Sequence, residues 1–142
     1  MNTVQIGSLM ATTSKEKTWE AISVAAPAPD MSFGSCQLVD ETTGERWVCR
    51  EGEQPAWPIS IPYGHQVGTS FLCSNTGDVA VNVFVYISII DPDGVTRASA
   101  TLPKGTIPQT VGPGVGYYSD YIGGVTLDKV GLWLIYGRLD YI

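Results

Sequence analysis

The segment Val79–Ile90, VAVNVFVYISII, constrains the fold more than any other part of this chain. Every second residue in it is β-branched, namely Val79, Val81, Val83, Val85, Ile87 and Ile89. This period of two predicts a β-strand with one buried face. The other face is mixed in character and includes Asn82, Phe84 and Tyr86. It is therefore free to lie in water, under a loop or against another chain.

The turn after this strand, Asp91-Pro92-Asp93-Gly94, predicts a hairpin with a second strand at 95–102. With a four-residue loop, Ile87 lies opposite Ala98. The aliphatic face then continues through small and apolar residues, and the mixed face receives Arg97, Ser99 and Thr101.

A second hairpin is predicted around Glu41–Gly44, between CQLVD and ERWVC. The same loop length puts Leu38 opposite Trp47 and Cys36 opposite Cys49. A directly opposed cysteine pair can reach disulfide spacing. The first twenty residues do not predict a secretory leader, so the two thiols are expected to be reduced more often than paired.

Alternating segments also occur elsewhere, and no segment has a convincing helical period. We therefore predict an all-β fold of about seven to nine strands, an antiparallel β-sandwich of immunoglobulin-like or jelly-roll-like type. Residues 1–17 are expected to form an N-terminal arm or edge strand, and residues 18–142 a single sandwich domain. Besides the two hairpins, further strands are expected at 19–26, 59–61, 66–74, 114–122 and 130–142. The last of these is apolar on both faces, which favours a central position.

Charge and hydropathy limit the classes of partner. The formal net charge is −6, and the eight Lys and Arg residues are scattered, so a nucleic-acid partner is not expected. Every apolar run is of strand length and broken by polar residues or glycine, which argues against a membrane span. The protein is expected to be used in the cytosol, exported by another route, or released by lysis within an assembly.

From Gln66 onward, the chain resembles immunoglobulin-like surface modules of the CARDB type. The resemblance is carried by the turn Asn75-Thr76-Gly77, the turn Asp91-Pro92-Asp93-Gly94, and Gly131 with Trp133. It covers roughly the second half of the chain. It implies a sandwich that serves in binding or spacing, without catalysis.

The polar residues give no catalytic or metal-binding pattern. His65 is the only histidine and no nucleophile motif accompanies it, so we interpret it as a turn residue. The three cysteines lack zinc-ligand spacing, and Cys73 is interpreted as a buried thiol. Asp91 and Asp93 could offer oxygen atoms to calcium, but hairpin geometry already explains them. The spacing of Asp120, Asp128 and Asp140 predicts no acid–base pair. We expect no cofactor, no metal and no enzymatic activity.

The aromatic residues exceed what one small core must hold, so some are expected at the surface as contacts for protein or glycan. The candidate interface comprises Trp57, Asn82, Phe84, Tyr86, Tyr117, Tyr118 and Tyr121. The leading hypothesis is a structural protein that self-associates or joins a larger assembly, as a phage capsid decoration or tail-associated protein in a virion. The alternative is a cell-surface or secreted module that binds glycan or protein.

Overall fold

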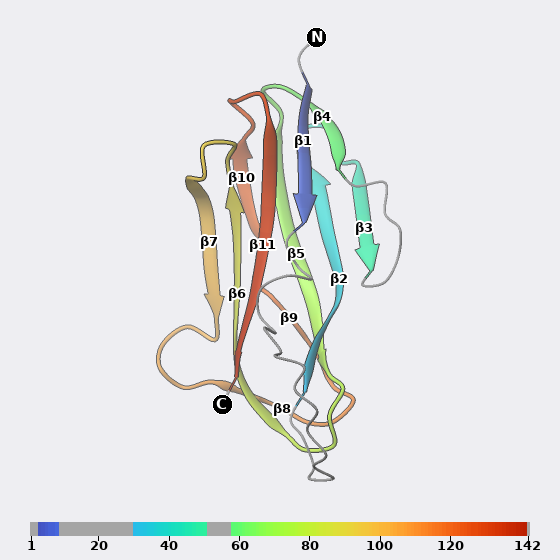
Figure 1. Ribbon diagram of the computed structural model, residues 1–142, viewed down its shortest axis with the longest axis vertical. Coiled ribbons are helices and arrows are strands. Elements are labelled where there is room, and N and C mark those ends of the chain that lie inside the picture. Colours follow the sequence, from blue (N-terminus) through green and yellow to red (C-terminus); the bar gives the residue numbers. More distant parts are fainter. Residues whose placement is uncertain (1–2, 9–29, 51–57, 142) are drawn as a thin grey trace, which may run out of the picture.

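The computed structural model describes residues 3–8, 30–50 and 58–141, and these contain eleven β-strands and no helix. Six strands form one sheet, sheet A, and five form a second, sheet B, which packs against it as a β-sandwich (Figure 1). The all-β sandwich is thus confirmed, with more strands than expected. No helix in the described ranges could cross a membrane. The strands are β1 (Thr3–Ser8), β2 (Met31–Asp40), β3 (Arg46–Arg50), β4 (Ile59–Pro62), β5 (Gln66–Asn75), β6 (Val81–Ile90), β7 (Thr96–Leu102), β8 (Gln109–Val111), β9 (Gly116–Tyr118), β10 (Ile122–Thr126) and β11 (Leu132–Tyr141).

The order of strands in sheet A is β4-β1-β11-β6-β7, with β8 also paired to β6. In sheet B the order is β10-β5-β2-β3, with β9 also paired to β5. The strand at the C-terminal end, β11, lies between β1 and β6, as its two apolar faces predict. Neighbouring strands are antiparallel except β1 and β11, which run parallel.

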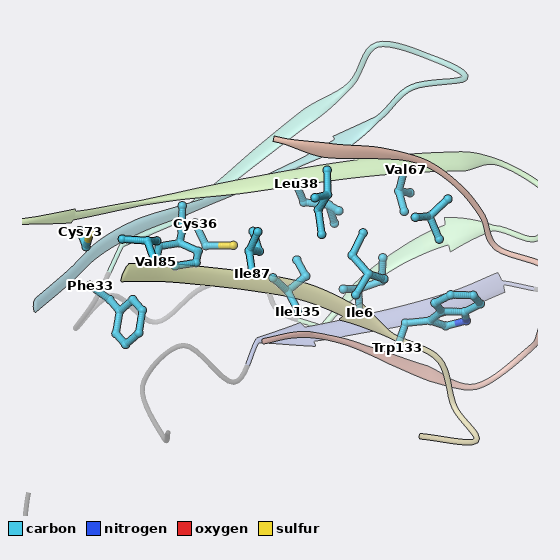
Figure 2. Close-up of a cluster of buried hydrophobic side chains, with 14 of the residues drawn as sticks. Ile6, Phe33, Cys36, Leu38, Val67, Cys73, Val85, Ile87, Trp133 and Ile135 are labelled. Carbon is cyan, nitrogen blue, oxygen red and sulfur yellow. The ribbon is translucent and has the colours of Figure 1, made fainter. Parts of the chain in front are cut away.

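The core lies between the two sheets and takes the odd-numbered side chains of β6. Val81, Val83, Val85, Ile87 and Ile89 are each at most 1% exposed. Figure 2 shows Val85 and Ile87 close to Leu38 and Cys36 of sheet B and to Ile135 of sheet A. The predicted direction of the two faces of this strand is therefore confirmed.

The first hairpin has the predicted register. Leu38 is opposite Trp47, and Cys36 is opposite Cys49. Its loop is closed by the Asp40 N–H, which donates to the Glu45 carbonyl (2.8 Å), and Gly44 adopts a φ of 81°. Cys36 is fully buried, while the side chain of Cys49 lies outside the described part of the chain.

The second hairpin differs from the predicted register by two residues. Ile87 lies opposite Ala100, not Ala98. The Asp91 N–H donates to the Val95 carbonyl (2.8 Å), so the loop has three residues and ends at Gly94, whose φ is 82°. A bulge at Arg97 adds the second residue of the shift. An even shift leaves the faces of the strand unchanged, so Ala98 and Ala100 still pack against the core.

The expectation of an edge strand or arm at the N-terminal end is wrong for residues 3–8. These residues form β1, which lies inside sheet A between β11 and β4 (Figure 1). Val4 and Ile6 are at most 1% exposed and belong to the core. The edge strand of this side is β4, whose residues Ile59–Pro62 pair with β1. The expected strand at 19–26 lies outside the described residues.

Candidate binding surfaces

The even-numbered residues of β6 lie on the outer side of sheet A, as predicted. Asn82 is exposed, and Phe84 and Tyr86 are half-buried. The neighbouring strand β11 adds Tyr136 and Arg138 to the same side. We call these five residues the A face.

The A face is held together by contacts between its own side chains. The Tyr86 and Tyr136 rings meet edge to face, with centroids 6.0 Å apart. The Arg138 guanidinium lies over the Tyr86 ring at 4.7 Å, and its Nε donates to Asp140 Oδ2 at 3.0 Å. The A face is therefore ordered before any partner arrives. The sequence alone did not single out Tyr136 and Arg138, because their place depends on the pairing of β11 with β6.

The three tyrosines predicted as interface residues after position 116 lie in three different environments. Tyr117 packs against the core opposite Cys73, whose thiol donates to the Tyr117 carbonyl at 3.0 Å. Tyr118 points to the other side of sheet B and is 65% exposed. Tyr121 lies over Gly68, and its hydroxyl donates to Glu41 Oε2 at 2.6 Å. None of the three adjoins the A face in the strand pairing, and Trp57 lies outside the described residues.

A shallow hollow of about 120 Å³ opens on the outer side of sheet B, beside Tyr118. It crosses strands β3, β2, β5 and β9. We call it the β5 hollow. The residues that line it are Ser35, Gln37, Val48, Ser70, Phe71, Leu72 and Tyr118.

His65 links two turns at one end of the sandwich. Its Nδ1 lies 2.8 Å from Oδ2 of the buried Asp40, and Asp40 Oδ1 accepts the Thr42 N–H at 3.0 Å. Burial alone would raise the pKa of Asp40, but the hydrogen bonds from His65 and Thr42 outweigh burial and lower it. This contact ties the β2–β3 turn to the β4–β5 turn, in agreement with a turn histidine.

A network of ion pairs joins the β6–β7 turn to the loop before β11. Asp91 Oδ2 lies 3.0 Å from Lys129 Nζ, and Lys129 also contacts Asp93 at 2.8 Å. Hydrogen bonds from the Val95 N–H (3.0 Å) and the Asp93 N–H (2.9 Å) satisfy Asp91 Oδ1. The carboxylate oxygens of Asp91 and Asp93 that could have offered ligands to calcium are therefore engaged by a lysine and by backbone N–H groups. Within residues 3–8, 30–50 and 58–141, no three His, Cys, Asp or Glu side chains form a metal-binding group.

Arg97 belongs to this network and not to the mixed face on which it was expected. It forms two hydrogen bonds of 2.8 Å with the Asp128 carboxylate, and its guanidinium lies 5.2 Å from the centre of the Trp133 ring. Trp133 is fully buried and donates from Nε1 to the Lys129 carbonyl at 2.9 Å. The bulge in β7 is the reason, because it places Arg97 outside the regular alternation.

The Cys73 thiol is suited to packing and not to nucleophilic chemistry. It is fully buried, and burial raises its pKa to about 12. The thiol therefore stays protonated at neutral pH, which fits its interpretation as a small hydrophobic residue.

Comparisons of the chain with models of known protein families, with characterised proteins and with solved structures find no match. Functional inference therefore depends on the A face, the β5 hollow and the strand edges. The resemblance to CARDB-type modules stays a prediction, although its motif residues Pro92 and Gly131 lie close together.

Proposed function

We propose that the protein is a non-enzymatic structural component that acts through protein–protein contacts, in a virion as a capsid decoration or tail-associated protein. The observation that carries the proposal is the A face. Tyr and Arg side chains are enriched among the residues that dominate the energy of protein interfaces. Here Tyr86, Tyr136 and Arg138 lie side by side on the exposed side of a sheet whose inner side is core.

The order within the A face favours binding. A surface side chain normally loses rotamer freedom when a partner covers it, at a cost of roughly 0.5–1.5 kcal/mol. Arg138 is already stacked on Tyr86 and hydrogen-bonded to Asp140, so much of that loss has occurred before binding. A partner gains an aromatic surface with a guanidinium held in place by an ion pair to Asp140.

The edge of sheet A supports self-association as a second element of the proposal. Strand β7 pairs with β6 and with no other described strand. Its sequence, TRASATL, contains no proline, and its one charged residue, Arg97, is engaged by Asp128. The bulge at Arg97 interrupts the start of this edge, but residues 98–102 contain neither proline nor charge, and exposed edges of that kind are templates for pairing with another strand. A second copy of the chain is the partner that we infer for this edge.

Light scattering coupled to size-exclusion chromatography tests the assembly. We expect trimers or larger species for the full chain, and a clean monomer at high concentration would refute the proposal. Tyr86→Ser should shift the assembly towards monomer, because it removes the ring on which Arg138 stacks. Tyr63→Ser is the matched control, since Tyr63 is 49% exposed but lies in the β4–β5 turn. Ser99→Lys tests the β7 edge separately, because a charge there opposes strand addition.

The virion setting has a test of its own. Genes for portal, capsid or tail proteins beside the gene for this chain would support it. If none of these genes is nearby and the protein is absent from purified particles, the virion setting is refuted. The protein would then be an assembly protein that acts outside virions.

A further inference from the structure

The β5 hollow lies on the sheet opposite the A face, and its floor follows from the strand registers. One row of side chains crosses sheet B as Val48, Gln37 and Ser70. The adjacent row runs through Ser35 and Leu72 to Tyr118. Ser70 lies beside Gln37 in the first row and Ser35 lies beside Leu72 in the second, so each row places a small side chain next to a longer one at the depression.

The polar groups in the β5 hollow have no partner in the described part of the chain. The side chains of Ser35, Gln37 and Ser70 form no hydrogen bond there, although the Gln37 backbone carbonyl accepts one from Thr69. Two hydroxyls and an amide thus offer both donors and acceptors over a small area. Beside them stands the ring of Tyr118, which is 65% exposed.

We propose that the β5 hollow binds one neutral sugar ring of a glycan. A sugar ring has an apolar face of C–H groups and an edge of hydroxyls. The face can stack on the ring of Tyr118, whose π surface is electron-rich. The hydroxyls can pair with the Gln37 amide and the serine hydroxyls. Val48 and Leu72 provide apolar contact at the sides, in the usual mixture of apolar walls and a few polar groups.

The lack of charge on the residues that line the β5 hollow favours a neutral sugar over other classes of ligand. The residues lining the β5 hollow are all uncharged, which favours a neutral ligand over a phosphate, a sulfate or an acidic sugar. The side chain of Arg50, which pairs with Ser35, lies outside the described part of the chain. The net charge of −6 further disfavours anionic ligands. An extended peptide would pair with a strand edge, whereas the β5 hollow lies on the face of the sheet. The site does not depend on assembly, but a protein attached through the A face would present the β5 hollow to the outside.

A glycan array probed with the full-length protein tests the proposal. We expect signal on neutral glycans and a dissociation constant measurable by calorimetry with the best of them. Tyr118→Ala should weaken binding about tenfold, because it removes the stacking ring. Ser70→Leu should abolish the signal by filling the β5 hollow while Tyr118 stays in place. Circular dichroism should show both variants folded.

Tyr63→Ala is the matched control, because it removes a similarly exposed ring that does not line the β5 hollow, and its signal should equal that of the wild type. No signal on any glycan, or signal confined to acidic glycans, would overturn the proposal. Equal loss in Tyr63→Ala and Tyr118→Ala would also overturn it. A signal from the unglycosylated carrier protein alone would assign the surface to a protein partner instead.

Discussion

Asn75 at the end of β5 provides a quantitative test of how the turn into β6 is held. It is 1% exposed, and its Nδ2 donates to the carbonyls of Val79 (2.8 Å) and Val111 (2.9 Å). Its Oδ1 accepts the Gly77 N–H at 2.9 Å. One side chain thus joins the turn after β5 to β8. Asn75→Ala removes all three hydrogen bonds without a change of charge.

The expected cost follows from those three bonds. A hydrogen bond contributes about 1 kcal/mol net, so Asn75→Ala should lower the free energy of unfolding by about 3 kcal/mol. This is a large fraction of the roughly 5–15 kcal/mol typical of a domain. Urea unfolding followed by tryptophan fluorescence measures it, and the midpoint should fall by roughly 1–3 M for a typical dependence on urea.

Asn82→Ala is the matched control, because Asn82 is exposed and has one side-chain hydrogen bond, from Thr110 Oγ1 at 2.7 Å. Its cost should stay below about 1 kcal/mol. Asn75→Asp keeps the bond from Gly77 but directs a carboxylate at two carbonyl oxygens. It should be at least as unstable as Asn75→Ala at neutral pH and recover partly in acid, where the protonated group can donate. A loss below about 1 kcal/mol for Asn75→Ala, or equal losses at the two asparagines, would refute the reasoning.

Three further predictions concern the core and two titrating groups. Val85→Asp should unfold the protein because it buries an unpaired charge, whereas Asn82→Asp should leave the circular dichroism spectrum native; a folded Val85→Asp variant would show that the faces of β6 are reversed. Burial alone would raise the pKa of Asp91, but the Val95 N–H and the Lys129 ammonium outweigh it and lower the pKa to about 2. Ionised Asp91 therefore stabilises the folded state at pH values above its unfolded-state pKa. This stabilisation is lost as the pH falls from about 4 to about 2. Urea titrations across this range should show a flatter curve for Asp91→Asn, and an unchanged slope would contradict the assignment. Burial and the hydrogen bond to Glu41 raise the pKa of Tyr121 to about 12. The stability that the protonated Tyr121 adds is therefore complete below about pH 10 and is lost as the pH rises through about 12. In an ultraviolet titration, Tyr121→Phe should remove the last tyrosine to ionise, and Glu41→Gln should shift that step to lower pH.

Local patterns in the sequence predicted the strands whose partners are close along the chain. The alternation of β6 gave its buried face, and the turn at Glu41–Gly44 gave the register of the first hairpin. The second register was wrong for two reasons, because D-P-D-G fits a loop of three or four residues equally well and because a bulge at Arg97 adds a second residue to the shift. The loop length accounts for the first residue. The choice depends on the Asp91 side chain, which accepts the Val95 N–H inside the turn.

Features that depend on distant pairing were not accessible from the sequence. The place of β1 beside β11 is set by tertiary contact, and no local signal in residues 3–8 indicates it. The residues predicted to form one interface lie on different surfaces for a similar reason. Neighbouring tyrosines on a strand point to opposite sides, so Tyr117 packs inwards and Tyr118 outwards. Which side is core depends on the sheet that covers it.

The parallel pair of β1 and β11 has a consequence for the order of events during synthesis. Ile6 pairs with Trp133, so sheet A closes only when the two ends of the described chain meet. Among the described strands, β4 pairs with β1 and no other, and it too lacks a place in the sheet unless β1 is docked. Contacts between residues so far apart in sequence form slowly. A nascent chain can form the β2–β3 hairpin of sheet B and the β6–β7 hairpin of sheet A early, but sheet A cannot close until β11 has been made.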